Sequence, residues 1–149
     1  MIAGIVTTYK LQLIREGSVT YPDEQLTHSE KVAKLFTDYI GNADREIFVV
    51  IAVDTRNRCI GINTVSVGSI DTAIVTAREV FKFAILANAA RLFLAHNHPS
   101  GDCNPSGSDL KITLDLVNAG KVFDIEVLDH VITGYDGKYY SMRTQNQIQ

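Results

Sequence analysis

The sequence IFVVIAV at residues 47–53 is the stretch that decides the fold. It is apolar throughout and rich in branched side chains, which is typical of a central strand covered on both faces. The chain then turns at residues 54–57 and resumes a strand pattern at residues 59–67. These two apolar segments predict a hairpin, or a near-hairpin, within a sheet.

Helix and strand patterns alternate on both sides of this hairpin. The first helix is introduced by capping-box spacing at Thr27-His28-Ser29-Glu30 and is followed by Gly41. The predicted helices are residues 27–41, 73–90 and 106–120. The further predicted strands are residues 91–95, 125–133 and 138–142. Alternating elements with hairpins predict an α/β fold with a mixed sheet.

The length of 149 residues and the hydrophobic content of 46% predict one domain over residues 1–149. Residues 1–26 form an unassigned N-terminal arm or strand, with weak alternation of apolar and polar side chains at residues 9–15. Residues 80–95 are the most apolar long stretch, but charged and polar residues interrupt them. We therefore expect no membrane span and no export signal.

The charge and the cysteine content indicate which classes of partner and which cellular compartment to expect. The 14 basic and 17 acidic residues give a net charge of -3, so we expect no strong nucleic-acid binding. Cys59 and Cys103 are the two cysteines, and their wide spacing suggests neither a disulfide framework nor an all-cysteine metal site. A reducing cytoplasm fits this composition.

Two histidines and an aspartate have the spacing of metal ligands. His96 and His98 stand at i and i+2 where a strand ends, so both imidazoles can project to the same side. Ten loop-forming residues separate them from Asp109, which can therefore fold back toward them. Two imidazoles and one carboxylate complete a three-ligand zinc set that keeps a fourth position for water. The alternative for Asp109 is a capping box with Ser106, which has the same spacing.

At these residues the sequence resembles the JAMM, or MPN+, metalloprotease pattern: a remote Glu46, His96-Asn97-His98, Ser106 and Asp109. The strings HNHPSG (residues 96–101), Pro105-Ser106 and DHVI (residues 129–132) are similar to the RadC branch of that family. The resemblance implies a three-layer, mixed-sheet fold related to cytidine deaminases and a zinc site. It also implies Glu46 as general acid and base, and Ser106 as hydrogen-bond donor to the developing oxyanion.

Each of these residues also has a plainer interpretation. Glu46 could be a solvated acid paired with Arg45 or Lys82, and Ser106 could be only a helix N-cap. Cys103 lies within the ligand loop and is more typical of an ordinary loop thiol. His130 could orient a metal ligand from the layer behind it, or be a hydrogen-bonded strand histidine.

The function expected from the resemblance is a zinc-dependent hydrolase, a metallopeptidase or isopeptidase acting on a protein or peptide substrate. The alternative is a non-catalytic or DNA-processing protein of the RadC type, associated with DNA repair. The helix-hairpin-helix region that precedes this domain in full-length RadC proteins has no counterpart in the sequence, which weakens that alternative.

Overall fold

The computed structural model describes residues 4–22, 25–68 and 75–149. In this part of the chain one sheet of five strands has the spatial order β2-β1-β3-β4-β5. β3 and β4 are parallel and the other neighbours are antiparallel, which confirms the predicted mixed sheet. The strands are β1 (Ile47–Val53), β2 (Cys59–Val67), β3 (Arg91–Asn97), β4 (Glu126–Thr133) and β5 (Tyr139–Ser141).

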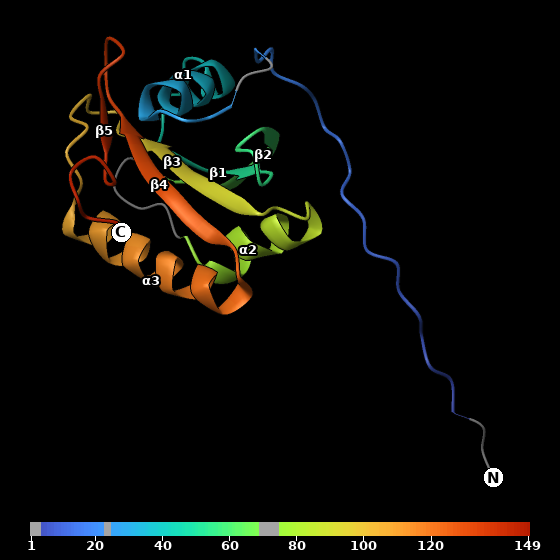
Figure 1. Ribbon diagram of the computed structural model, residues 1–149. Helices are drawn as coiled ribbons and strands as arrows, with labels where there is room; N and C mark the ends of the chain where they lie inside the picture. Colours follow the sequence, from blue (N-terminus) through green and yellow to red (C-terminus); the bar gives the residue numbers. More distant parts are fainter. Residues whose placement is uncertain (1–3, 23–24, 69–74) are drawn as a thin grey trace.

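Helices cover both faces of the sheet, so the fold has three layers (Figure 1). Alternate side chains of β1 explain why both layers form. Val49 and Ile51 are fully buried on the α1 side, whereas Phe48 and Val50 are buried on the side of α2 and α3. The helices are α1 (Ser29–Ile40), α2 (Ala77–Leu86) and α3 (Gly107–Phe123).

The capping box predicted at residues 27–30 is wrong. α1 begins at Ser29, and its N-cap residue His28 makes no capping hydrogen bond through its side chain. The Thr27 hydroxyl instead bonds the neighbouring His28 ring, with Oγ1 and Nδ1 2.8 Å apart. The Ser29 hydroxyl is also engaged elsewhere, because it donates to Asp129 Oδ2 at 3.0 Å.

The other two helices differ from the prediction at their ends. Residues 73 and 74 of the predicted second helix lie outside the described residues, and α2 begins only after Thr76, whose hydroxyl accepts from the Glu79 amide. α3 continues past Gly120, where a Cβ atom would overlap the Ile125 carbonyl oxygen. Gly120 therefore permits a close approach of the chain and does not end the helix.

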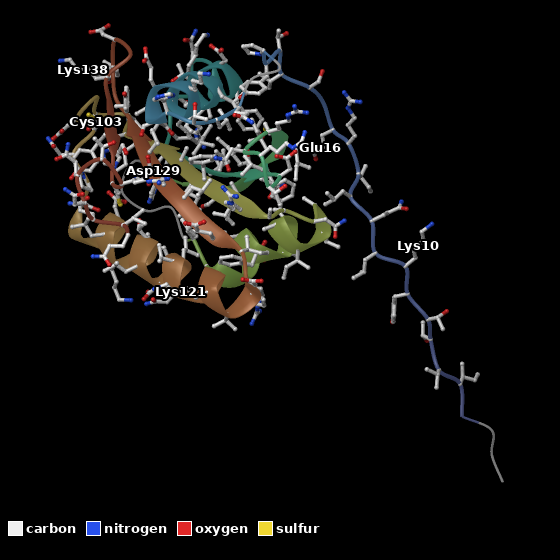
Figure 2. The ribbon with its side chains drawn as sticks, viewed as in Figure 1. Lys10, Glu16, Cys103, Lys121, Asp129 and Lys138 are labelled. Atoms are coloured by element: carbon white, nitrogen blue, oxygen red, sulfur yellow. The ribbon has the colours of Figure 1, made fainter. Side chains whose placement is uncertain are left out.

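Residues 4–18 form an extended, exposed arm outside any helix or strand. Figure 1 shows it leaving the body of the molecule, and Figure 2 shows Lys10 well outside that body. The root of the arm is held where Val19 and Tyr21 pack against the apolar cluster under α1. No helix in the described ranges is long and apolar enough to cross a membrane.

Candidate metal centre

The end of β3 and the start of α3 bring His96, His98 and Asp109 together. The Nε2 atoms of the two histidines are 3.0 Å apart. Asp109 Oδ1 lies 3.3 Å from His96 Nε2, and Oδ2 lies 3.4 Å from His98 Nε2. Ligand atoms around a tetrahedral zinc ion are about 3.3 Å apart when each bond is about 2.0 Å. The three side chains therefore match the donor types and spacing of a zinc site.

The loop between the ligands is shaped so that α3 starts beside the histidines. Gly101 has φ of +85°, a left-handed conformation that favours glycine, and its amide donates to the His98 carbonyl at 2.9 Å. A side chain at Gly101 would also overlap the ring of Tyr135. This tight turn folds the loop onto the β4–β5 connection and returns the chain toward β3.

Asp109 takes part in the capping box and faces the histidines at the same time. Its Oδ2 accepts from the Ser106 amide at 2.7 Å, and its own amide donates to Ser106 Oγ at 3.1 Å. Burial alone would raise the pKa of Asp109, but hydrogen bonds from the His96 and His98 rings, when these are protonated, outweigh it and hold the pKa well below its usual range. The two interpretations of Asp109 are therefore compatible, and capping fixes the carboxylate in place.

His98 presents its Nε2 lone pair to the site when its ring is neutral. Its Nδ1 is 2.6 Å from the Asp102 carbonyl oxygen, which can only accept, so Nδ1 carries a proton. Neutral His98 then has an unprotonated Nε2, as zinc binding requires. The hydrogen bond with Asp109 raises the pKa of His98 above its ordinary value, with burial opposing the shift.

A chain of buried hydrogen bonds sets the proton position on His96. The Thr113 hydroxyl donates its proton to the Asp109 carbonyl at 2.6 Å. The hydroxyl oxygen of Thr113 can therefore only accept from His130 Nδ1, which lies 2.5 Å away. Burial lowers the pKa of His130 well below its ordinary value, so the ring is neutral and its Nε2 accepts from His96 Nδ1 at 2.7 Å. When its ring is neutral, His96 therefore also turns the Nε2 lone pair toward the site.

Glu46 lies next to this group, at the start of β1. Burial raises the pKa of Glu46, while the charges of His96 and His98 oppose the shift, so these rings are close enough to act on it. The cations proposed as its surface partners pair elsewhere. Arg45 bonds Asp44 at 3.1 Å, and Lys82 bonds Glu79 at 2.8 Å.

Asn97, which was not predicted from the sequence, fixes the backbone around Glu46. The side chain of Asn97 accepts from the Ile47 amide at 2.7 Å and donates to the Arg45 carbonyl at 3.0 Å. The Gly68 amide adds a bond of 2.9 Å to the Glu46 carbonyl. The position of Asn97 between two predicted ligands was the available signal.

Thr113 and Cys103 are two further residues near the candidate ligands. Thr113 was also missed, although its place one helical turn after Asp109 could have indicated it. Cys103 stays outside the group of three candidate ligands found in the described ranges. Its side chain instead packs against the small apolar cluster around Ile132 and Met142.

Comparisons with known proteins show which sequences this chain is similar to. A UPF0758 protein of Moorella thermoacetica is 47% identical over 134 residues, covering 90% of this chain and 58% of the relative. A UPF0758 protein of Methanosarcina mazei is 35% identical over 147 residues, covering 99% of this chain and 64% of the relative. The chain thus spans somewhat more than half the length of these relatives. The RadC-like JAB domain matches residues 26–147, and the chain belongs to that family.

Proposed function

We propose that this chain is a zinc-dependent hydrolase that cleaves an amide bond in a peptide or isopeptide substrate. The observation that carries the proposal is the convergence of the two histidine Nε2 atoms and one carboxylate, each side chain fixed by its own hydrogen bonds. A set of three protein ligands is typical of catalytic rather than structural zinc sites. Zinc held there would polarise a carbonyl group and acidify water.

Glu46 is the proton carrier in this proposal. Burial raises the pKa of Glu46 in the direction of neutral pH, which helps its carboxyl group both to take and to return a proton. The bonds of Asn97 and Gly68 hold its backbone beside the ligands without using its carboxylate. Glu46 can therefore accept a proton from water and deliver it to the leaving amine.

Ser106 is positioned to donate a hydrogen bond. Its oxygen accepts from the Asp109 amide, which leaves the hydroxyl proton available for a developing oxyanion. We propose that capping and donation are combined in this one hydroxyl. Ser106→Gly should keep most of the capping stability, since glycine costs only a few tenths of a kcal/mol at an N-cap, and should lower turnover.

The test begins with the metal content of the purified chain and a screen for cleavage of a mixed peptide and isopeptide library. Glu46→Gln should retain zinc and the fold but lose the hydrolysis found for the wild type. Glu126→Gln is the matched control, because Glu126 is exposed at the far end of β4. Unchanged turnover in Glu46→Gln would remove Glu46 from the mechanism, and loss of zinc would make it a ligand.

A further inference from the structure

The exposed arm carries an unused strand pattern. Tyr9, Leu11 and Leu13 alternate with polar residues, and their exposed fractions are 86%, 78% and 48%. Among the described residues, the backbone of residues 4–14 finds no hydrogen-bond partner. Over residues 8–13 the segment has one apolar and one polar face, which is the pattern of a half-buried edge strand, and Ile14 ends the alternation.

The sheet has an unpaired edge of similar length. β2 lies at the end of the strand order and, in the described part of the chain, pairs only with β1. Its nine residues, CIGINTVSV, include no charged residue and no proline, the side chains that usually protect an edge. Two register irregularities interrupt its pairing with β1 and leave a regular run at residues 61–64 between them. The other edge strand, β5, has only three residues.

We propose that the arm of one copy of this chain adds as a strand to the free edge of β2 in a second copy. Residues 8–15 span roughly 26 Å when extended, and β2 spans roughly 30 Å, so the two are matched in length. Pairing would satisfy the open backbone groups of both segments and cover the apolar face of the arm.

The choice of a second copy follows from where the arm lies. The arm leaves the body, and residues 4–18 are exposed along their whole length (Figure 1). Each copy then offers one unpaired strand and one unpaired edge, so two copies related by a two-fold axis satisfy each other completely. This exchange produces a closed dimer and leaves the histidine site outside the pairing.

The test uses the full chain and two paired measurements. Light scattering after size exclusion gives the mass over a range of concentrations, and hydrogen exchange gives the protection of the backbone amides. We expect a dimer in which residues 9–14 and β2 are protected together, and in which dilution removes both protections. Leu11→Asp should raise the dimer dissociation constant by about tenfold or more, since burying a leucine contributes that much to affinity.

The matched control is Val122→Asp, because Val122 is 82% exposed on α3 and should leave the dimer unchanged. Thermal unfolding of both variants checks that the body still folds. A monomer at all concentrations would overturn the proposal, and so would an arm that is protected within a monomer, which would show pairing inside one chain. A dimer broken by Val122→Asp but not by Leu11→Asp would place the interface elsewhere and also overturn it.

Discussion

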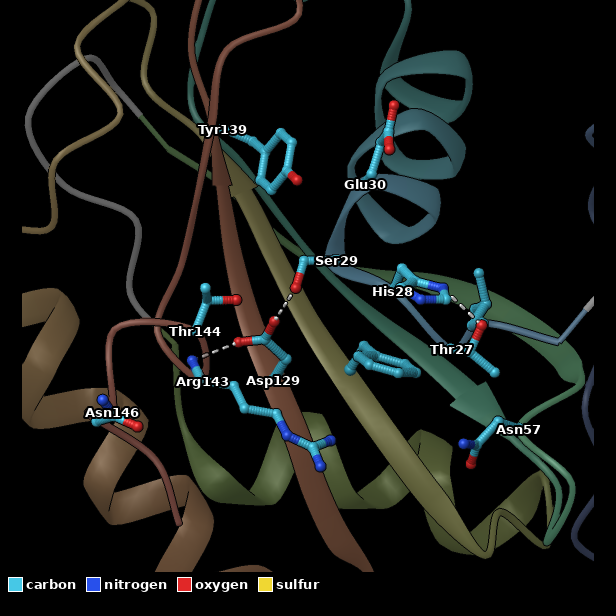
Figure 3. Close-up of a pocket in the computed structure, with 12 residues that line it drawn as sticks. Thr27, His28, Ser29, Glu30, Asn57, Asp129, Tyr139, Arg143, Thr144 and Asn146 are labelled. Atoms are coloured by element: carbon cyan, nitrogen blue, oxygen red, sulfur yellow. Dashed lines mark hydrogen bonds between the residues drawn. The ribbon is translucent and has the colours of Figure 1, made fainter.

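Asp129 and His130 are neighbours on β4, both almost completely buried, yet they face opposite layers and behave differently. Asp129 faces α1 and accepts four hydrogen bonds, of which Figure 3 shows those from Ser29 and Arg143. A carboxylate has about four acceptor sites, so none is left over. The donors are the hydroxyls of Ser29 and Ser141, at 3.0 and 2.6 Å, and the amides of His130 and Arg143, at 2.7 and 2.9 Å. All acceptor sites of Asp129 are used, so we call this group of residues the closed network. It joins α1 to the end of the sheet.

The hydrogen bonds of His130 belong to a second group of residues, which we call the open network because it ends at the candidate metal ligands. It runs from the Asp109 carbonyl through Thr113 and His130 to His96, and ends in a lone pair beside that of His98. Buried polar groups whose hydrogen bonds are all made, such as Asp129, hold helices and strands together. A network that ends in converging lone pairs keeps capacity for a metal ion.

The position of a cavity beside Asp129 also separates the closed network from the candidate metal site. A cavity of about 600 Å³ lies on the α1 face, between the start of α1 and the C-terminal residues, and Asp129 forms part of its wall. It is not the place where the candidate ligands meet. Since every acceptor of Asp129 is already used, the cavity offers space but no free carboxylate lone pair there.

The largest expected effect is the loss of metal from the open network. The purified wild type should carry about one zinc per chain, and His96→Ala or His98→Ala should lose it, because two protein ligands hold zinc poorly. Elemental analysis after dialysis measures the content. Asp129→Asn serves as the control from the closed network and should retain the zinc. Full occupancy in both histidine variants would refute the ligand assignment.

Breaking the closed network should change stability and not metal content. Asp129→Ala removes the carboxylate acceptor from the buried amide of His130 and the part-buried amide of Arg143, which should cost about 3 kcal/mol of unfolding free energy. For a chain of this size we expect the melting temperature to fall by about 6–12 °C. Calorimetry and zinc analysis of the same sample separate the two effects. A variant that keeps its stability but loses zinc would reverse our distinction between the networks.

A smaller effect is expected from the middle of the open network. His130→Leu removes the acceptor for His96 Nδ1 and should weaken zinc binding by about 10–100-fold. His130→Gln keeps an acceptor oxygen and should be affected less. Competition with a chelator measures both affinities. Equal affinity in the wild type and His130→Leu would show that His130 only fills space.

The two networks also show what the sequence could and could not predict. The apolar run of β1, the mixed sheet and three layers followed from periodicity and family resemblance, since these depend on local pattern. The approach of Asp109 to the histidines was expected from the loop composition. The positions of Asn97 and Thr113 beside predicted ligands were a signal, but the bonds that they make did not follow from periodicity or loop composition. They depend on which strand lies beside β3 and which face of α3 meets β4, and both are tertiary facts.

The pH dependence should differ between the metal-free and metal-loaded protein. In the metal-free protein the pKa of His98 is raised and that of Asp109 is lowered. Their contribution to stability is complete between the ordinary values of 3.8 and 6.5. It is lost as pH rises through the pKa of His98, and also as pH falls through that of Asp109.

Zinc reverses the upper part of this trend, because it must displace a proton from His98. Its affinity should fall about tenfold for each pH unit below the His98 pKa. Chelator competition at several pH values, compared with thermal melts of the metal-free protein, tests both trends. A zinc affinity that does not change below neutral pH would contradict the assignment of His98 as a ligand.

The smallest expected effect concerns nucleic acid, where the two faces of the sheet should not differ at all. Net charge is -3, and each helix pairs one of its lysines with a nearby acid at 2.7 or 2.8 Å. Neither helical layer therefore carries a strong positive field. We expect duplex DNA to bind with a Kd of about 0.1 mM or weaker at physiological salt, without sequence preference.

A salt titration decides the matter, because the slope of log affinity against log salt counts the phosphates neutralised. Tight binding with a slope equivalent to about six phosphates would favour a DNA-processing role over the hydrolase. Repeating the titration with Arg143→Ala and Lys111→Ala would then identify the face responsible, since Arg143 lines the cavity on the α1 side and Lys111 lies on α3.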